Sequence, residues 1–340
     1  MKMITIFDTS SGSGNIGDSI IMESVERELN EIIRDYSIFQ FKVSTHSRIT
    51  PEQRESIKKS KLKIVCGTNL FRLRYRPFKL NSNPWKIRVT DIKDLNNTLF
   101  FGVGTTILPK KEDIIHKTAY KLTEKYSGYL WNEILNKEIP HSVRDQETCE
   151  MLKRIGIKNV INTGCPTLWN LDENHCKNIP TKKGKNVILT ITGKATEDIY
   201  LKYLEIATKN YEKVFMWPQS IVDIPYMEKV KNHFGNKIEI IAATLKAYDE
   251  VLENEESLDY IGSRLHGGIR ALQHKRRSII IAIDSRARSF RNDFNLPVID
   301  IKNLSDLETM INSEFRTEIK LKSDRIEEFK SALKQYLNKL

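Results

Sequence analysis

Short apolar runs alternate with longer amphipathic stretches along the first half of the chain. Five runs have the length and β-branched content of strands: Lys2–Phe7, Ile38–Val43, Lys61–Cys66, Thr98–Val103 and His141–Arg144. Three longer stretches between or after them have helical spacing: Asp18–Ile33, Thr118–Leu135 and Glu147–Ile155. This alternation is typical of a parallel sheet that is covered by helices, so the first half is predicted to be α/β.

The same alternation returns in the second half after a polar, glycine-containing segment, Asn170–Lys185, which is a predicted linker. The predicted strands are Asn186–Ile191, Lys213–Trp217, Ile238–Ile241, a run ending at Tyr260–Ile261, and Ser278–Ile283. The predicted helices are Thr196–Tyr211, Tyr226–Phe234, Gly267–Gln273, Ser305–Asn312 and Ser323–Leu340. We therefore expect two Rossmann-like domains, residues 1–172 and residues 173–340, with the terminal helices in the second. Ligands of such domains bind at the carboxyl ends of the strands, here in a cleft that the two domains face.

The composition is that of a globular protein without a membrane span. The chain of 340 residues is 39% hydrophobic and 29% charged, and no window approaches the roughly 20 apolar residues of a transmembrane helix. The N-terminus enters a strand at once, so neither a signal peptide nor a transit peptide is predicted and a cytoplasmic location is expected. The four cysteines are scattered singly, which predicts reduced thiols and no zinc site.

The formal net charge of +11 favours anionic partners but does not select among them. Nucleic acid, an anionic membrane face and negatively charged small substrates would all be attracted, and peripheral contact with the inner membrane face is permitted. A merely basic surface made of lysines on helix faces explains the charge equally well. Because charged residues gather at predicted strand ends of ordered α/β units, nucleic-acid binding is the least favoured of these. No heptad or apolar stripe predicts an oligomer.

The most informative stretch is Ser263–Ala271, a turn between a predicted strand and a predicted helix. Arg264 and His266 stand where the free N–H groups of a helix start point outward, which is an anion site in outline. Arginine offers two parallel donors to a phosphate or carboxylate, and histidine changes charge near neutral pH. The alternative is a turn whose histidine only caps backbone groups.

The loop after the first strand contains the pattern Gly-x-Gly-x-x-Gly, ending at Gly17. A dinucleotide site also requires an acidic residue at the end of the second strand, and that strand ends in Val43-Ser44-Thr45-His46. The loop therefore favours another anion or an acceptor over a nicotinamide or flavin cofactor. Asn15 and Asp18 are candidate partners of sugar hydroxyls, although Asp18 could equally cap its helix.

Three further groups of cations stand near predicted strand ends or in loops. Arg144 is a second candidate anion ligand, or else an ion-pair partner of Asp145 or Glu147. Arg286 or Arg288, after the most apolar strand of the second half, would emerge near His266. The Arg72–Lys79 segment interleaves cations with aromatic residues and has three interpretations: nucleic-acid stacking, an acceptor-facing loop, or a solvated loop.

In order and spacing, these residues resemble the polysaccharide pyruvyl transferase family. The resemblance rests on Gly14-Asn15-Ile16-Gly17-Asp18, Ser142-Val143-Arg144-Asp145 and Arg264-Leu265-His266-Gly267, and it spans nearly the whole chain. It implies a two-domain fold like that of GT-B glycosyltransferases, with an acceptor-side first domain and a donor-side second domain. It further implies transfer of a pyruvyl group from phosphoenolpyruvate to two hydroxyls of one sugar of a cell-surface polysaccharide or its precursor.

By this resemblance, His266 would be the general acid or base, and Arg144 and Arg264 would bind the donor anion. The remaining substrate-binding candidates are Arg286, Asn15, Asp18, Gly17 and Gly267. The resemblance implies no cofactor and no metal, with phosphoenolpyruvate as donor substrate. In two places the chain departs from the family pattern. Arg286 stands where a lysine is usual, and Cys66-Gly67-Thr68-Asn69 replaces a glycine-rich strand end.

Two other functions remain open at this stage. A GT-B-like glycosyltransferase would keep the fold and the basic site but use a nucleotide sugar as donor. A non-enzymatic protein that binds nucleic acid or polysaccharide would show an affinity that falls steeply with salt and does not depend on His266. The acceptor sugar is not predicted, and it could be lipid-linked, nucleotide-linked or polymeric.

Overall fold

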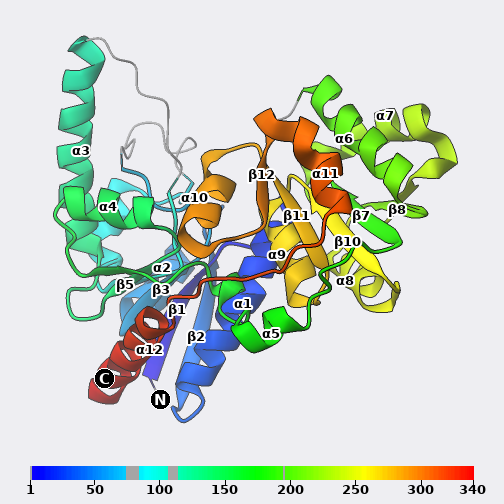
Figure 1. Cartoon of the computed structure of the whole chain (residues 1–340). Helices are drawn as coiled ribbons and strands as arrows, with labels where there is room; N and C mark the ends of the chain where they lie inside the picture. Colours follow the sequence, from blue (N-terminus) through cyan, green and yellow to red (C-terminus); the bar gives the residue numbers. More distant parts are fainter. Residues whose placement is uncertain (1, 74–83, 106–113, 194–195) are drawn as a thin grey trace. The chain divides into compact units, whose positions relative to one another are not determined.

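The structure is a computed structural model that describes residues 2–73, 84–105, 114–193 and 196–340 (Figure 1). It divides into two compact units. Unit 1 comprises Met1–Ser13, Ile21–Trp169 and Lys322–Leu340, and unit 2 comprises Gly14–Ile20 and Asn170–Leu321. Each unit contains a parallel sheet with helices, so the predicted α/β class is confirmed.

Unit 1 is built on a parallel sheet of strand order β2-β1-β3-β4. The strands are β1 (Lys2–Asp8), β2 (Ile38–Ser44), β3 (Leu62–Cys66) and β4 (Thr98–Phe101). A parallel pair, β5 (His141–Val143) and β6 (Val160–Asn162), continues this sheet through a bridge between Val103 and Val143. The order 2-1-3-4-5 is one of the two common orders of doubly wound folds.

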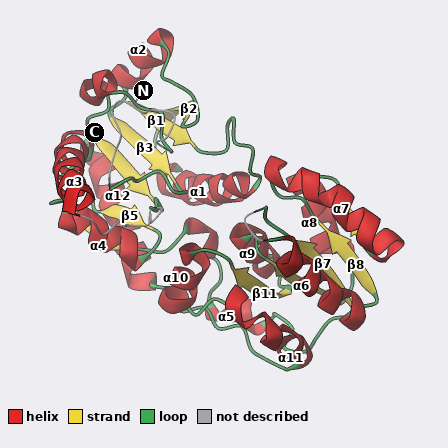
Figure 2. Cartoon of the chain, turned by 90° about the horizontal axis from the view of Figure 1, so that it is seen from above, coloured by secondary structure: helices red, strands yellow, loops and turns green. Residues whose placement is uncertain are grey.

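Helices pack beside the sheet of unit 1 (Figure 2). They are α1 (Gly17–Ile33), α2 (Pro51–Lys59), α3 (Ile114–Ile134), α4 (Gln146–Arg154) and α12 (Ser323–Lys339). An aromatic cluster fills the core, where the ring centroids of Phe7 and Trp85 lie 4.9 Å apart and those of Phe100 and Trp131 lie 5.6 Å apart.

Unit 2 contains a six-stranded parallel sheet of order β12-β11-β10-β7-β8-β9. Its strands are β7 (Asn186–Thr190), β8 (Lys213–Met216), β9 (Glu239–Ile240), β10 (Leu258–Gly262), β11 (Arg277–Ala282) and β12 (Val298–Asp300). Counted from β7, this is the Rossmann order 3-2-1-4-5-6, read from the other edge. The strand order reverses between β7 and β10, and a doubly wound sheet binds its ligand at the carboxyl ends of the strands that flank such a reversal.

Seven α-helices are found among the described residues of unit 2: α5 (Glu173–Lys177), α6 (Glu197–Asn210), α7 (Ile224–Phe234), α8 (Leu245–Asn254), α9 (Leu265–Gln273), α10 (Ser285–Phe294) and α11 (Leu307–Asn312). The core beneath them joins apolar residues of β7, β10 and β11 to Tyr200, Tyr203 and Leu204 of α6, all fully buried. The helices that start directly after β10 and β11 are α9 and α10, and their first turns position the site described below.

The observed units differ from the expected domains at three places. The predicted linker Asn170–Lys185 contains α5, whose N-cap Asp172 accepts a hydrogen bond from the backbone N–H of His175 at 2.7 Å. The last helix, expected in the second domain, belongs to unit 1, where Lys330 pairs with Glu28 at 2.6 Å. Residues Gly14–Ile20, expected in the first domain, are grouped with unit 2. For α12 and Gly14–Ile20, long-range contacts decide the grouping, and local sequence does not encode them.

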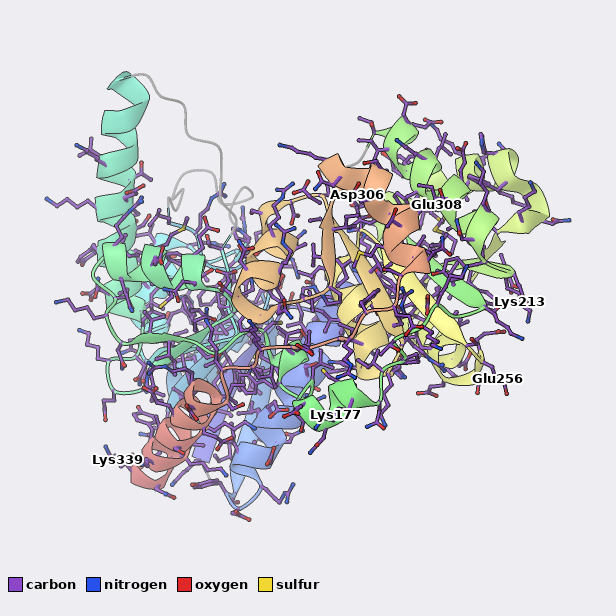
Figure 3. The ribbon with its side chains drawn as sticks, viewed as in Figure 1. Lys177, Lys213, Glu256, Asp306, Glu308 and Lys339 are labelled. Atoms are coloured by element: carbon purple, nitrogen blue, oxygen red, sulfur yellow. The ribbon has the colours of Figure 1, made fainter. Side chains whose placement is uncertain are left out.

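Exposed lysines account for much of the positive charge. Lys177 and Lys213, both labelled in Figure 3, keep 65% and 64% of their side-chain surface exposed although each has an acidic neighbour. Solvated pairs of this kind add little stability. The four cysteines are buried and free. No helix among the described residues is long and apolar enough to cross a membrane.

Candidate functional site

A cavity of about 190 Å³ lies at the carboxyl ends of β7, β10 and β11 in unit 2. Its lining comes from the segments that follow these strands, from the end of β8 and from the first loop of the chain: Asn15, Thr192, Gln219, Ser263, Arg264, Leu265, His266, Ile281, Ile283, Asp284, Arg286 and Ala287. The cavity lies where the strand order reverses, between β10 and β7, and doubly wound sheets bind their ligands at such positions. The N-terminal turns of α9 and α10 both contribute to the lining, and such turns favour anions.

Arg264 is the N-cap residue of α9, and its side chain is 13% exposed. Its Nε donates to Asp223 Oδ2 at 3.0 Å and to the carbonyl oxygen of Ile191 at 3.2 Å, while Nη2 binds Asp223 Oδ1. Nη1 makes no hydrogen bond to the residues that the structure describes, and the side chain lines the cavity. The pair with Asp223 therefore fixes the guanidinium plane and leaves one nitrogen for a ligand.

The residues that contact Arg264 are buried. Asp223 is fully buried, and burial raises the pKa of its carboxyl while the hydrogen bonds from Arg264 oppose that rise. Tyr260 donates from its hydroxyl to the carbonyl oxygen of Arg264 at 2.8 Å, and burial raises its pKa, so it stays a neutral phenol. Held from both the side chain and the backbone, Arg264 loses little further conformational freedom when it binds an anion.

His266 is the second residue of α9 and is 5% exposed. The strand-to-helix turn that was predicted for this stretch is confirmed, since β10 ends at Gly262 and α9 begins at Leu265. His266 lines the cavity together with Arg264, at the start of a helix whose first N–H groups lack intrahelical partners. Its position therefore suits proton transfer to a ligand that these donors hold.

Arg286 completes the cationic part of the lining. It is the second residue of α10, and its Nε and Nη2 bind Asp284 Oδ2 at 3.0 and 2.6 Å. Asp284 also caps the helix by accepting from the backbone N–H of Arg286 at 3.1 Å. Arg288, the other candidate, binds Asp300 and is not among the residues that line the cavity. Arg286, and not Arg288, therefore lines the cavity together with Arg264 and His266.

The first loop reaches this cavity through Asn15. Its backbone forms an antiparallel bridge with Ser220, in which Ile16 N–H donates to the carbonyl of Gln219 and Ile221 N–H to that of Gly14, each at 2.9 Å. Asp18 is buried in the first turn of α1, and its backbone N–H donates to the carbonyl of Asn15 at 3.0 Å. Asp18 is not among the lining residues, whereas Asn15 is.

The carboxamide of Gln219 lies close to two glycines of the sequence motifs. A Cβ atom on Gly17 would lie 2.6 Å from Gln219 Nε2, and one on Gly267 would lie 2.9 Å from Gln219 Oε1. Neither glycine lines the cavity itself. Gly17 and Gly267 would therefore act in substrate binding only through Gln219, because they leave space for its carboxamide.

Arg144 lies in unit 1 and not in this cavity. Its side chain is 1% exposed, its Nε donates to Asp145 Oδ2 at 3.0 Å, and its Nη2 donates to the carbonyl of Thr105 at 3.1 Å. The structure thus contains the ion pair with Asp145 that was the alternative to an anion site. Nη1 is buried without a hydrogen-bond partner among the described residues. The role of Arg144 as an anion ligand stays a prediction.

The residues that sequence reasoning missed are Thr192, Gln219, Asp223 and Asp284. Gln219 and Thr192 each follow a strand by two or three residues, so the strand-end rule could have found them. Asp223 has no local signal because it meets Arg264 only in the folded unit. Most of the Arg72–Lys79 segment lies outside the described residues. Among those that are described, no cluster of three histidine, cysteine or acidic residues is arranged to hold a metal ion.

Comparison with known proteins adds an independent finding. The sequence profile of the family described as polysaccharide pyruvyl transferase matches residues 15–285. No curated protein matches the chain significantly. Among solved structures, the wall teichoic acid polymerase TagF is similar at 11% identity and a TM-score of 0.44, covering 99% of this chain and 82% of its own. The UDP-GlcNAc 2-epimerase from Neisseria meningitidis is similar at 12% identity and a TM-score of 0.44, covering 99% of both chains.

The profile match includes Asn15, the Arg144 segment, the whole turn from Ser263 to Ala271 and the start of α10. It therefore spans the second and third motifs on which the resemblance was based, all of the first motif except Gly14, and most of the cavity lining. The chain belongs to the polysaccharide pyruvyl transferase family.

Proposed function

We propose that the chain transfers a pyruvyl group from phosphoenolpyruvate to a sugar of a cell-surface polysaccharide or its precursor and forms a cyclic ketal. The observation that carries the proposal is the gathering of Arg264, His266 and Arg286 in one cavity at two helix N-termini, within a member of this family. Two cations, helix-start N–H groups and one titratable imidazole suit a small substrate that carries both a carboxylate and a phosphate.

In this proposal the donor anion binds to the guanidinium groups of Arg264 and Arg286. Nη1 of Arg264 is the nitrogen that Asp223 does not occupy, and Arg286 is anchored at the start of α10 by Asp284. Held in this way, both arginines are already oriented before the substrate arrives. Arg144 is buried and ion-paired in unit 1, and the proposal gives it no part in this site.

His266 acts as the general acid and base. It protonates the methylene carbon of the enol ester as a sugar hydroxyl forms a bond to the adjacent carbon, and it takes up the proton that this hydroxyl releases. The bond from that carbon to the phosphate oxygen then breaks, and phosphate leaves with the bonding electrons. The second hydroxyl closes the ketal on the same carbon and passes its proton to the departing phosphate, because His266 already carries the proton of the first hydroxyl. The arginines stabilise the charge on the phosphate.

A thermal-shift titration with phosphoenolpyruvate tests the donor. A ligand that binds only the folded protein raises its melting temperature, so wild type is expected to show a rise that Arg264→Ala abolishes. Arg288→Ala is the matched control, because Arg288 pairs with Asp300 and does not line the cavity. It should keep the rise. A rise with UDP-N-acetylglucosamine and none with phosphoenolpyruvate would instead indicate glycosyl transfer.

Turnover tests the role of His266. His266→Asn should keep the melting-temperature rise with phosphoenolpyruvate, because the arginines still hold the anion. It should also lose at least about a hundredfold of pyruvyl transfer, as expected for loss of a general acid. A variant that transfers at a rate near wild type would exclude His266 as the proton donor.

A further inference from the structure

Gln219 has a more unusual environment than any other lining residue that the structure describes. It follows β8, is 2% exposed, and its carboxamide is wedged between Gly17 and Gly267 at distances that exclude a Cβ on either. Its backbone carbonyl accepts from Ile16 N–H at 2.9 Å. The backbone and the side chain of Gln219 thus both have defined contacts, and the residue lines the cavity.

The orientation of this carboxamide follows from a chain of donors and acceptors. A backbone N–H can only donate, so the atom of Asn15 that faces Gly17 N–H at 3.2 Å must be its oxygen, Oδ1. The same Oδ1 lies 2.9 Å from the Gln219 carboxamide and can only accept there too, so Gln219 presents Nε2 to it. The other atom of the carboxamide, Oε1, is therefore an acceptor that faces away from Asn15.

Gln219 Oε1 is buried and has no hydrogen-bond partner among the described residues. An unpaired buried acceptor destabilises the folded state, so this atom, in a residue that lines the cavity, suits a donor that a ligand brings. We infer that Gln219 Oε1 accepts a hydrogen bond from the attacking hydroxyl of the sugar acceptor. This inference rests on the proposed function and extends it to the second substrate.

The chemistry of the two proposed substrates supports this choice. The carboxylate of phosphoenolpyruvate only accepts hydrogen bonds, and an amide oxygen repels it, whereas a sugar hydroxyl donates. The cations of the site, Arg264 and Arg286, take the anion, and the neutral acceptor oxygen of Gln219 takes the neutral substrate. Gln219 lines the same cavity as His266, the group proposed to take the proton of the hydroxyl.

Gln219→Met tests the inference because it keeps the length of the side chain and removes the acceptor. The acceptor probe is the lipid-linked and polysaccharide fraction extracted from cells that encode the chain, and the donor is phosphoenolpyruvate with labelled pyruvyl carbons. We expect the half-saturating amount of extract to rise about tenfold, as for loss of one hydrogen bond. The half-saturating phosphoenolpyruvate concentration and the melting-temperature rise that it causes should stay at the wild-type values.

Two further variants separate binding from folding. Gln273→Met is the matched control, since Gln273 lies at the end of α9 and does not line the cavity, and it should behave as wild type. Gln219→Glu keeps an acceptor oxygen but adds a negative charge, so it should weaken phosphoenolpyruvate binding and leave the dependence on extract close to wild type. It also provides a test if Gln219→Met does not fold.

The outcomes are distinguishable. An unchanged dependence on extract in Gln219→Met, or a loss of the phosphoenolpyruvate-induced rise together with the extract dependence, would overturn the inference while the proposed function stands. Wild type that neither binds phosphoenolpyruvate nor transfers label would overturn the proposed function, and the inference with it. The split between the two substrates is the result that a merely structural role of Gln219 does not produce.

Discussion

Two arginine–aspartate pairs lie at opposite ends of the sheet in unit 2, and they differ in what surrounds them. Arg277 begins β11 and pairs with Asp259 at the amino ends of the strands, whereas Arg264 follows β10 and pairs with Asp223 at the carboxyl ends. All four side chains are mostly or fully buried. The same ion-pair chemistry therefore occurs in two settings within one unit.

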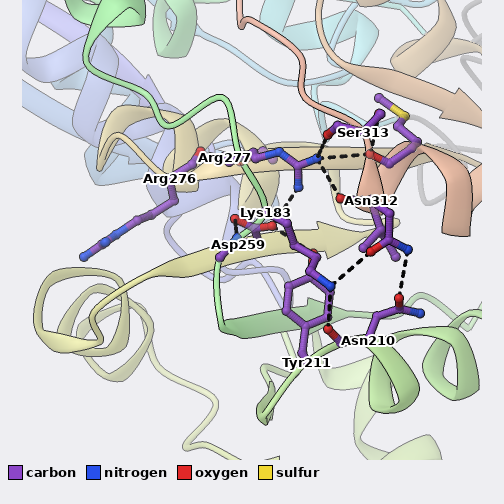
Figure 4. A network of polar contacts seen from close by, with 12 residues as sticks. Lys183, Asn210, Tyr211, Asp259, Arg276, Arg277, Asn312 and Ser313 are labelled. Atoms are coloured by element: carbon purple, nitrogen blue, oxygen red, sulfur yellow. Dashed lines mark hydrogen bonds and ion pairs between the residues drawn. The ribbon is translucent and has the colours of Figure 1, made fainter.

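The pair at the amino ends is enclosed by protein (Figure 4). Arg277 Nη1 binds Asp259 Oδ2 at 2.7 Å, and Nη2 donates to the carbonyls of Met310, Ile311 and Ser313 at 3.0, 3.0 and 2.9 Å. Tyr211 donates to Asp259 Oδ2 at 2.8 Å. Burial raises the pKa of the Asp259 carboxyl, and Arg277 opposes that rise. Both terminal nitrogens of Arg277 form hydrogen bonds within the protein, and these bonds join the end of α11 to the sheet.

The pair at the carboxyl ends borders the cavity. Asp223 binds one side of the Arg264 guanidinium, and Nη1 has no partner among the described residues. The difference follows from the sheet. At the carboxyl ends, α9 and α10 begin with N–H groups that lack intrahelical partners, and the segments after β7 and β10 line the cavity where the strand order reverses. A buried ion pair thus stabilises the fold at one end and orients a binding group at the other.

Removing Arg277 should have the largest effect on stability. Arg277→Met leaves Asp259 buried without its cation and three carbonyls without a donor, so we expect the free energy of unfolding to fall by about 4 kcal/mol. Urea unfolding measures this. The phosphoenolpyruvate-induced rise in melting temperature should persist in protein that remains folded, because the cavity is at the other end of the strands. A loss below about 1 kcal/mol would contradict the structural role.

His141 in unit 1 tests whether burial of a titratable side chain without an ion pair also affects stability. It is buried, its Nδ1 accepts from Phe100 N–H at 3.2 Å and its Nε2 contacts the carbonyl oxygen of Asn136 at 2.9 Å. Burial lowers its pKa from 6.5 to about 4. Between these two pH values, His141 is therefore neutral in the folded state and protonated in the unfolded state. The stabilising contribution of His141 is about 3 kcal/mol above pH 6.5, and it is lost as the pH falls towards 4.

His141→Gln provides the comparison, because glutamine can accept and donate in similar positions but does not titrate. The unfolding free energy of wild type minus that of His141→Gln should decrease as the pH is lowered from 6.5 to 4. Urea unfolding at half-unit intervals measures it. Parallel curves for the two proteins would show that His141 is protonated in the folded state, contrary to its enclosed position.

Removing Arg264 should cost less stability than removing Arg277 and more function. Arg264→Met leaves Asp223 without its cation, but water from the cavity can reach the carboxylate, so we expect a loss of about 2 kcal/mol in unfolding free energy. The phosphoenolpyruvate-induced rise in melting temperature should disappear. Equal stability losses for Arg264→Met and Arg277→Met would remove the distinction between the two ends of the sheet.

Much of the fold was predictable because its signals are local. The strand before Gly262, the turn and the helix after it follow from an apolar run and the residues that follow it, and the structure confirms each. Helix α8 was missed because it buries only Tyr248 and Leu252, which is a weak apolar stripe. Helix α10 was missed although Asp284 caps it and Ala287, Phe290 and Phe294 are buried at helical spacing, so here the signal was present.

The sequence alone determined the α/β class, the strand-end positions of Arg264, His266 and Arg286, and the order of motifs that places the chain in its family. Periodicity and the turn residues are properties of neighbouring positions, and they carry this information. Only the tertiary structure decided that Asp223 binds Arg264, that Arg144 is enclosed by Asp145 and Thr105, and that Gln219 lies between Gly17 and Gly267. These contacts join residues up to about 200 positions apart, and packing of the folded chain rather than local preference selects them.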